Sequence, residues 1–423
     1  MARGKERPIA VDLFAGAGGM TLGFEQAGFD VLAAVELDPI HACTHEYNFP
    51  FWTVLCRNIV DITGEEIRKL STIGDRDIDV VFGGPPCQGY SYIGRRALDD
   101  PRNFLIEDFV RIVLELEPSY FVFENVKGLT AGKNKCFLYK LIETFSKNGY
   151  QVRLPWKVLN AAYYGIPQRR ERLFLIGAKK GFVLLEYPTP CSQTLSATLV
   201  DSILPLTPSC WAALGDLPEA EEFDDLLDSD WVKTEKWGNP SSYAREMRCL
   251  DDSCWHFGYR RNWHPSVLTS SMRTNHSPIS RARFQVTEQG KKEPISHFFK
   301  LARNGLANTL RAGTDASHGA HTSPRPIHYS KPRCITVREM ARLHGFPDWF
   351  RFHITKWHGA RQVGNSVPPP LARAIGAEII KCLGITATTP ENILELGDPK
   401  LLSMNMKQAA NNLEKITIDR FLE

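Results

Sequence analysis

A cysteine and a carboxylate stand where two predicted strands end, and together they could carry out nucleophilic chemistry. Cys87 lies in the stretch Gly83-Gly84-Pro85-Pro86-Cys87-Gln88-Gly89-Tyr90-Ser91, and the next strand ends in Glu124-Asn125-Val126. A lone cysteine is more often a small buried hydrophobe. Here, however, glycines and prolines fix an irregular loop at a strand end, which favours a preorganised nucleophile. A cysteine beside a carboxylate suggests covalent attack with acid assistance.

A second group of residues indicates a nucleoside site of an altered type. The first predicted strand runs into Asp12-Leu13-Phe14-Ala15-Gly16-Ala17-Gly18-Gly19, and glycines at such a turn let a ligand approach the backbone amides. A dinucleotide fingerprint needs its third glycine at position 21, where this chain has Thr21. Glu36 could accept hydrogen bonds from both ribose hydroxyls, and Asp61 could bind an adenine amino group. A structural turn and surface acids are the alternatives, but three such features at successive strand ends favour a site.

These residues need a sheet to bring them to one edge. Residues 1–180 alternate short apolar runs with helical patterns, which predicts a parallel α/β sheet with helices on both faces. A loop-rich unit without clear periodicity follows over 181–333, and regular patterns return from 334. Helices are expected from about Gly19, over 103–116, over 337–344 and over 368–383. The expected strands are Ile9–Phe14, Val31–Glu36, Asp79–Gly83, Tyr120–Glu124 and Leu173–Gly177.

Composition excludes several classes of protein. The chain has 423 residues, of which 43% are hydrophobic and 23% charged, so disorder, collagen and coiled coil are poor interpretations. No apolar run approaches the roughly 18 residues that span a bilayer, and the start has no signal-peptide core. The ten cysteines include no Cys-x-x-Cys pair, which fits reduced thiols in a cytoplasmic protein. Cys249, Cys254, His256 and His264 match no standard zinc spacing, so no metal is expected.

Charge is distributed unevenly along the loop-rich unit. The net charge is only +3, but residues 216–252 carry twelve acidic and four basic side chains, whereas residues 260–333 carry thirteen basic and three acidic ones. A basic block interleaved with aromatic residues is typical of a surface that meets phosphates, and a solvated charged face is the alternative. The candidate phosphate contacts in this block are Arg260, Arg261, Arg273, Arg281, Arg283, Arg303 and Arg311.

In this order, the motifs resemble those of the C5-cytosine DNA methyltransferase family. Phe14-Ala15-Gly16-x-Gly18-Gly19 is similar to its first motif, Pro86-Cys87-Gln88 to its nucleophile loop, and Glu124-Asn125-Val126 to its next strand-end signature. Residues 168–172, QRRER, fit its Gln-x-Arg-x-Arg motif, and two further motifs follow at 336–339 and 362–368. Six motifs spaced in family order over positions 12–376 are far more specific than any one of them.

The resemblance implies a fold and a reaction. The fold would be a Rossmann-like class I methyltransferase sheet with a smaller target-recognition domain. Cys87 would add to carbon 6 of a cytosine flipped out of the duplex, while a protonated Glu124 donates to ring nitrogen 3. Arg172 would hold the base carbonyl oxygen, and Arg170 would support the loop and a nearby phosphate. Gln88 and Ser91 would contact the DNA.

The resemblance also implies S-adenosylmethionine as the methyl donor, leaving S-adenosylhomocysteine. The catalytic domain would be discontinuous, over 1–180 and 334–385, around a recognition domain at 181–333, with 386–423 as a C-terminal tail. Leu37 replaces a frequent aromatic residue, which affects one face of the cofactor pocket. The implied cofactor residues are Phe14, Ala15, Gly16, Gly18, Gly19, Glu36, Leu37, Asp61, Ile62, Pro85, Leu105, Asn365 and Val367.

The leading hypothesis is a sequence-specific DNA (cytosine-5-)-methyltransferase that acts on double-stranded DNA as a monomer. The short segment before the first strand favours a bacterial enzyme, of the restriction-modification type with a cognate endonuclease or solitary. A tRNA cytosine-5 methyltransferase of the same fold is a second hypothesis, against which the large basic insert speaks. A non-catalytic DNA-binding homologue is a third, against which Cys87, Glu124, Arg170 and Arg172 argue.

Overall fold

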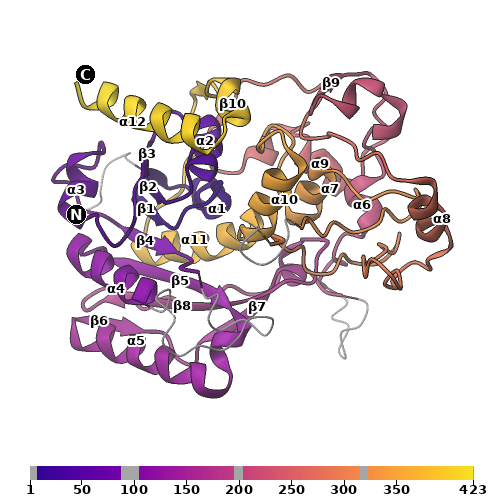
Figure 1. Cartoon of the computed structure of the whole chain (residues 1–423). Coiled ribbons are helices and arrows are strands. Elements are labelled where there is room, and N and C mark those ends of the chain that lie inside the picture. Colours follow the sequence, from indigo (N-terminus) through magenta and orange to yellow (C-terminus); the bar gives the residue numbers. More distant parts are fainter. Residues whose placement is uncertain (1–6, 87–103, 195–202, 315–321, 423) are drawn as a thin grey trace.

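The structure, a computed structural model, describes residues 7–86, 104–194, 203–314 and 322–422. Its centre is a sheet in the order β3-β2-β1-β4-β5-β8-β6, with β7 also paired to β8 (Figure 1). The strands of this sheet are β1 Ile9–Leu13, β2 Asp30–Glu36, β3 Thr53–Cys56, β4 Val80–Gly83, β5 Tyr120–Val126, β6 Tyr150–Val152, β7 Lys157–Asn160 and β8 Glu171–Lys179.

The first five strands are parallel, as the sequence predicts, but β8 is not. β8 pairs antiparallel with β5, from Tyr120 opposite Ala178 to Val126 opposite Arg172. The expectation of a wholly parallel sheet is therefore wrong at this strand. A parallel neighbour would need a crossover helix, but β7 and β8 are joined only by a short connection with the 3-10 turn Ala161–Tyr164. β8 therefore pairs antiparallel with β7, as in a hairpin.

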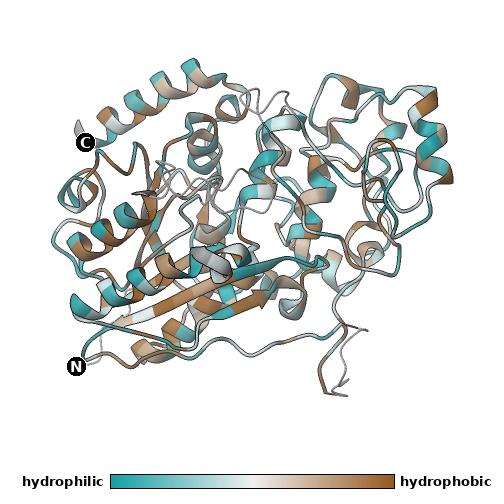
Figure 2. Cartoon of the chain, turned by 60° about the horizontal axis from the view of Figure 1, so that its bottom comes forward, coloured by the Kyte–Doolittle hydropathy of each residue, from teal (hydrophilic) through white to brown (hydrophobic). Residues whose placement is uncertain are grey.

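The sheet extends on both sides of β1, with β2 and β3 on one side and β4 and β5 on the other. Helices therefore cover both of its faces. Right-handed crossovers then place α1 and α4 on opposite faces. Phe24 of α1 stacks on Phe82 of β4 at 3.9 Å, and Phe109 of α4 meets Phe123 of β5 at 5.5 Å. Figure 2 shows the hydrophobic colour concentrated on the strands, with mixed colours on the surrounding helices. These helices are α1 Gly19–Ala27, α2 Pro39–Asn48, α3 Gly64–Lys69, α4 Phe104–Leu116 and α5 Lys135–Lys147.

After residue 333 the chain returns to the sheet. α11 packs along α1 (Figure 1). α9 and α10 pack against each other, and α10 leads into α11. The capping box of Thr336 with Glu339 fixes the start of α9 at the expected residue. The remaining segment packs on α2 and β3 through its last helix. These helices and the short strand before the last are α9 Val337–His344, α10 Lys356–Asn365, α11 Pro369–Leu383, β12 Ile393–Leu394 and α12 Met406–Leu422.

Between residues 181 and 333 the elements are short, as the weak periodicity predicts. Small apolar clusters form around Leu226 and Phe284, while other side chains of this region, such as Leu301, join the main core. Among the described residues no helix has the length and apolar character of a membrane span. The elements are α6 Cys210–Leu214, β9 Val232–Lys233, α7 Ser242–Met247, β10 Arg260–Arg261, β11 Val267–Leu268 and α8 Pro278–Val286.

Candidate active site

A cavity of about 770 Å³ opens where the parallel strands end. Its wall contains Glu124 and Arg172 together with most of the residues expected to hold a cofactor. Residues from β1, β2, β4 and β5 meet here because parallel strands present their carboxyl ends at one edge of a sheet. The expected cofactor residues on the wall are Phe14, Ala15, Gly16, Gly19, Glu36, Leu37, Pro85, Leu105, Asn365 and Val367.

The turn after β1 contains residues with positive φ angles, a backbone conformation that glycine adopts more easily than other residues. Gly16 and Gly18 have φ angles of 56° and 99°, and Phe14 has 61°. A Cβ on Gly18 would come within 2.6 Å of Phe49, so that glycine serves packing behind the wall and does not line the cavity. A Cβ on Gly19 would meet the carbonyl oxygen of Val367 at 2.6 Å. This close approach brings the loop after α10 against the first turn.

Glu36 connects the first two strand ends. Its Oε2 accepts a hydrogen bond from the Gly16 amide at 2.7 Å, and its Oε1 accepts one from the Asp38 amide at 2.8 Å. Each carboxylate oxygen can accept a further hydrogen bond. The side chain is thus held at the cavity wall with acceptor capacity left for a ligand.

The structure does not bring Asp61 and Ile62 to this wall. β3 ends at Cys56, and the three residues that follow it, Arg57, Asn58 and Ile59, line the cavity instead. Asp61 is exposed, and Ile62 is buried in the main core. Sequence reasoning placed this strand end too late along the chain. The signal that could have found Asn58 is the end of the apolar run at Leu55.

Glu124 and Arg172 form a pair on the wall, from two adjacent antiparallel strands. Arg172 Nε lies 3.0 Å from Glu124 Oε1. The other carboxyl oxygen, Oε2, faces Gly84, where a Cβ would come within 2.6 Å. Burial raises the pKa of Glu124 although Arg172 and Arg170 act to lower it. Burial lowers the pKa of Arg172, and Glu124 opposes that effect. The pair leaves one carboxyl oxygen able to hold a proton.

Arg170 is held by main-chain carbonyl groups of the protein. It is buried, and its guanidinium donates to the carbonyl oxygens of Leu310 at 3.1 Å, Gly364 at 3.0 Å and Ser366 at 2.8 Å. These bonds fit the expectation that Arg170 supports a loop, while its contact with a phosphate stays a prediction. It is a positioning residue that ties β8 to the loop carrying Asn365 and Val367.

Cys87, Gln88 and Ser91 lie outside the described residues. Before these residues, the described chain ends at Pro86, and the neighbouring Pro85 is held in place by a hydrogen bond. Asn125 donates from Nδ2 to the carbonyl oxygen of Pro85 at 3.1 Å, and both Pro85 and Pro86 line the cavity. The segment that continues into Cys87 therefore starts at the wall that carries Glu124.

Comparisons with known proteins agree with this geometry. The model of the C-5 cytosine-specific DNA methylase family matches residues 10–381. The chain belongs to this family. It is 55% identical over 404 residues to the Type II methyltransferase M.XorII of Xanthomonas oryzae pv. oryzae, covering 96% of this chain and 92% of that relative. It is 33% identical to the Type II methyltransferase M1.HphI of Haemophilus parahaemolyticus, covering 88% and 86%.

A solved structure extends the comparison to the fold. A prophage-encoded E. coli protein, described as a DNA modification methyltransferase, superposes with a TM-score of 0.72 at 33% identity, covering 89% of this chain and 99% of that one. The protein is a sequence-specific DNA cytosine-5 methyltransferase, and its relatives place it in a restriction-modification context. The predicted family, fold class and enzyme class are confirmed.

In this methylase, the acidic and basic stretches within residues 181–333, the expected recognition region, neutralise each other in part. Three of the arginines expected to contact DNA already have acidic partners from the acidic stretch. Each pair places a carboxylate beside the arginine and so reduces the net positive charge that this surface offers to DNA. The pairs are Arg260 with Asp252 at 2.9 Å, Arg273 with Asp224 at 2.6 Å, and Arg281 with Glu221.

Arg261 is a correction to the expected DNA contacts. It is buried and pairs with Glu25 of α1 at 2.6 Å, with its guanidinium over the rings of Phe51 and Trp349 at 4.8 Å each. This arginine anchors the recognition region to the sheet and is closed to DNA. The sequence could not separate it from its neighbour Arg260, because its partners lie far along the chain.

The other expected arginines differ in the contacts that their side chains make and in their exposure to solvent. Arg283 Nε lies 3.7 Å from Glu293, and Arg303 lies over the Trp211 ring at 5.5 Å. Arg311 is exposed, next to α10: a Cβ on Gly364 would come within 2.6 Å of the Arg311 carbonyl oxygen. Arg311 is therefore the candidate that stands nearest to the residues that line the cavity.

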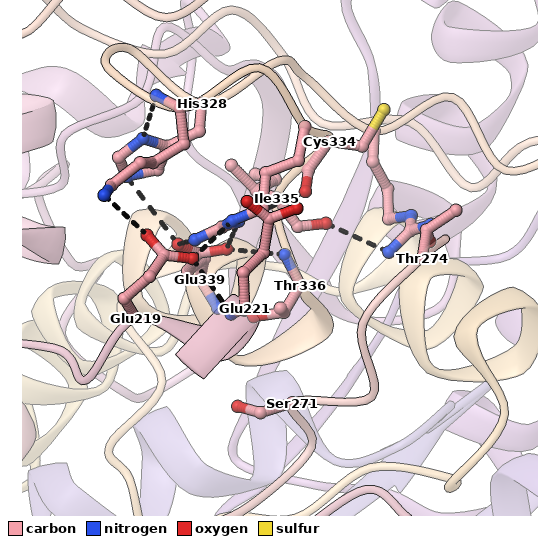
Figure 3. Close-up of polar contacts among 12 residues, drawn as sticks. Glu219, Glu221, Ser271, Thr274, His328, Cys334, Ile335, Thr336 and Glu339 are labelled. Carbon is pink, nitrogen blue, oxygen red and sulfur yellow. Dashed lines mark hydrogen bonds and ion pairs between the residues drawn. The ribbon is translucent and has the colours of Figure 1, made fainter. Parts of the chain in front are cut away.

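A buried charge network joins the recognition region to α9 (Figure 3). Arg333 pairs with Glu219 at 2.8 Å and with Glu339 at 2.9 Å, and His328 lies 3.7 Å from Glu339. Burial alone would raise the pKa of Glu339, but Arg333 overcomes it and the result is a pKa of about 2. Burial lowers the pKa of His328 to about 4, so this histidine is neutral near pH 7. The network fixes the recognition region without presenting charge to solvent.

His41 and Met406 are among the further wall residues that sequence reasoning missed. His41 lies two residues inside α2, and Met406 begins α12. Neither belongs to a motif, so no sequence signal pointed to them. Among the described residues, no group of three or more His, Cys, Asp or Glu side chains could hold a metal ion.

Proposed function

We propose that this methyltransferase acts through a covalent adduct between Cys87 and carbon 6 of a cytosine flipped out of duplex DNA. The observation that carries the proposal is the Glu124–Arg172 pair on the cavity wall. Pro86, the residue before Cys87, lines the same cavity. A stacked base cannot reach such a recessed carboxyl, so the target base has to leave the duplex.

The chemistry follows from the needs of the pyrimidine. Carbon 5 of cytosine is a poor nucleophile until a group adds at carbon 6. The Cys87 thiolate forms a bond to carbon 6 as the double bond between carbons 5 and 6 opens, while protonated Glu124 donates its proton to ring nitrogen 3, which receives the displaced electron pair. Arg172 fixes the Glu124 carboxyl through Nε and offers its remaining N–H groups to the base carbonyl oxygen. As carbon 5 takes the methyl group, ring nitrogen 3 returns its proton to the Glu124 carboxylate. Loss of the carbon 5 proton to a base then re-forms the double bond between carbons 5 and 6 and expels the Cys87 thiolate.

S-Adenosylmethionine fits the cavity, and when bound it supplies an electrophilic methyl group. The held carboxylate of Glu36 suits the ribose hydroxyls, and Phe14, Leu37 and Ile59 give apolar surface for adenine. Pro85, Leu105, Asn365 and Val367 close the remaining wall. The buried Nε2 of His41, without a hydrogen-bond partner among the described residues, also fits a polar ligand.

The remaining assignments are proposals about the whole enzyme. Residues 1–180 and 334–385 form the catalytic domain, 181–333 read the DNA, and 386–423 are the tail. The enzyme works as a monomer on double-stranded DNA in the cytoplasm, with a cognate restriction endonuclease as a partner. The family supports DNA as the substrate, and the relatives' names, Type II methyltransferases, support the restriction-modification context.

Mechanism-based trapping tests the covalent step. Duplex DNA that contains 5-fluorocytosine leaves no removable proton at carbon 5, so the adduct cannot resolve. We expect wild-type enzyme with S-adenosylmethionine to form a stable complex whose DNA-linked peptide carries Cys87. Cys87→Ser should form none and lose nearly all methyl transfer, while its cofactor affinity stays within a few-fold. Wild-type transfer without a trapped Cys87 would overturn the proposal. Labelling of tRNA in place of DNA would overturn the choice of substrate.

A further inference from the structure

The segment after the family match packs tightly on the cofactor side of the molecule. The family model ends at residue 381, and α12 lies along α2 and β3 (Figure 1). An apolar cluster joins Cys43 and Val54 to Leu402, Ala409 and Leu413. The segment is thus a built part of the fold.

Polar contacts fix the position of this segment along α2. The Ile354 amide donates to the carbonyl oxygen of Leu402 at 2.9 Å, and a ring nitrogen of His353 lies 3.2 Å from the carbonyl oxygen of Met404. At the far end, Arg420 pairs with Glu46 of α2 at 2.6 Å. Because both ends are held, the first residue of α12 has a defined place.

That first residue, Met406, reaches the cofactor cavity. Met406 lines it together with Leu37, Asp38 and His41. Leu37 and Met406 are large apolar side chains with exposed fractions of 64% and 50%. Both line the same cavity as Glu36, and a ligand bound against them would cover them. Burial of exposed apolar surface stabilises a complex, and a thioether makes favourable contacts with aromatic rings.

A second observation on the same wall points to a ligand. His41 is 6% exposed, and its Nε2 is buried without a hydrogen-bond partner among the described residues. A buried polar atom without a partner costs free energy, and a ligand atom at this wall could satisfy it. The wall formed by His41 and Met406 therefore offers one polar and one apolar contact.

We propose that the C-terminal segment is a working part of the cofactor site, in which Met406, with His41, contacts the adenosine portion of S-adenosylmethionine. The proposal rests on the proposed use of that cofactor. It assigns a share of cofactor affinity to Met406, which lies outside the family match, and to His41, which lies inside the match but in none of the six motifs. The cofactor selects no DNA sequence, so this contact affects affinity for the cofactor and not the choice of target.

Binding of S-adenosylhomocysteine to the full chain, measured by calorimetry, tests the contact. We expect Met406→Ala to weaken binding by about four- to fifteen-fold, because about one to two methylene equivalents of contact are lost. Met406→Leu should stay within about two-fold, since the apolar volume is kept. Ile418→Ala is the matched control: Ile418 is an exposed apolar residue of the same helix, at 52%, and is absent from the cavity wall. His41→Ala should weaken binding, and His41→Gln should weaken it less.

Oxidation of the wild-type protein gives a readout independent of substitution. Dilute peroxide converts exposed methionine to its sulfoxide. S-Adenosylhomocysteine should protect Met406, but not Met272 of the recognition region, as followed by peptide mass spectrometry. Unchanged affinity in Met406→Ala, or equal oxidation of Met406 with and without ligand, would overturn the proposal. If wild-type enzyme binds no S-adenosylhomocysteine, the proposed cofactor itself fails, which is a separate result.

Discussion

At the scale of single residues, Glu124 carries the clearest pH dependence. Burial raises the pKa of its carboxyl, with Arg172 and Arg170 opposing, so the neutral acid persists to higher pH than in free glutamate. Since the proposed step needs the protonated form, we expect the single-turnover methyl-transfer rate to fall as pH rises through this pKa. Arg172→Gln removes an opposing positive charge, so its alkaline limb should move to higher pH while its maximal rate falls. An alkaline limb that stays in place would contradict the assignment of the acid to Glu124.

Asp12 predicts a pH dependence of stability. Burial raises its pKa to about 8, with Glu36 adding to the shift and the hydroxyl of Thr21, 2.7 Å away, opposing it. Between the ordinary carboxyl pKa near 4 and this value, the unfolded chain has lost a proton that the folded chain keeps. The free energy of unfolding therefore decreases as pH rises over that interval.

Asp12→Asn removes this dependence, because an amide does not titrate. By scanning calorimetry, we expect its melting temperature near pH 8 to exceed that of wild type by roughly 2 to 4 °C, with the difference shrinking toward acid pH. Asp61→Asn, which changes an exposed carboxylate, is the control. A constant difference between wild type and Asp12→Asn at all pH values would contradict the prediction.

At the scale of elements, the close approach of α1 and α11 depends on Gly23. A Cβ there would lie 2.4 Å from the Ala372 side chain and 2.5 Å from the carbonyl oxygen of Pro369. The helices would have to separate, so Gly23→Ala should lower the free energy of unfolding by about 1 to 3 kcal/mol in urea titrations. Gly305→Ala, whose nearest neighbour would be 3.0 Å away, is the comparison and should change stability much less. Equal effects of the two substitutions would exclude helix contact as the cause.

The sequence predicts elements well where a local pattern decides them. The five strands near the expected ranges and the start of α9 at Val337 follow from apolar runs and a capping box. The cavity residues at strand ends, Gly16 and Glu36 among them, follow from the same patterns. Asn58 was missed because β3 is only four residues long and its end carries no turn signal.

Contacts between residues far apart in the sequence determine which arginines are buried, and the sequence alone does not predict them. Arg170 bonds a carbonyl 194 positions away, and Arg261 pairs with a carboxylate 236 positions away. Neither arginine differs in local pattern from an exposed one, so their burial could not be foreseen. For the same reason, the wall residue Met406, contributed by the last helix, could be found only from the fold.

At the scale of the whole molecule, the charge that reaches DNA is smaller than the basic stretch indicates. Of its expected contacts, Arg261 is buried and Arg260 is paired with Asp252, whereas Arg311 is exposed beside α10. Each phosphate contact adds roughly one to the slope of log affinity against log salt concentration. The measured slope should therefore lie well below the thirteen basic residues of the stretch.

Arg311 is where this argument can be tested on a single side chain. We expect Arg311→Ala to weaken binding to all duplex sequences and to lower the salt slope by roughly 1, because a free guanidinium releases its counterion on meeting a phosphate. Arg260→Ala should leave the slope nearly unchanged, since Asp252 already neutralises that charge in the free protein. Fluorescence anisotropy with one labelled duplex over a salt series measures both variants. If Arg260→Ala lowers the slope as much as Arg311→Ala does, the ion pair opens on binding and the acidic stretch does not screen the DNA surface.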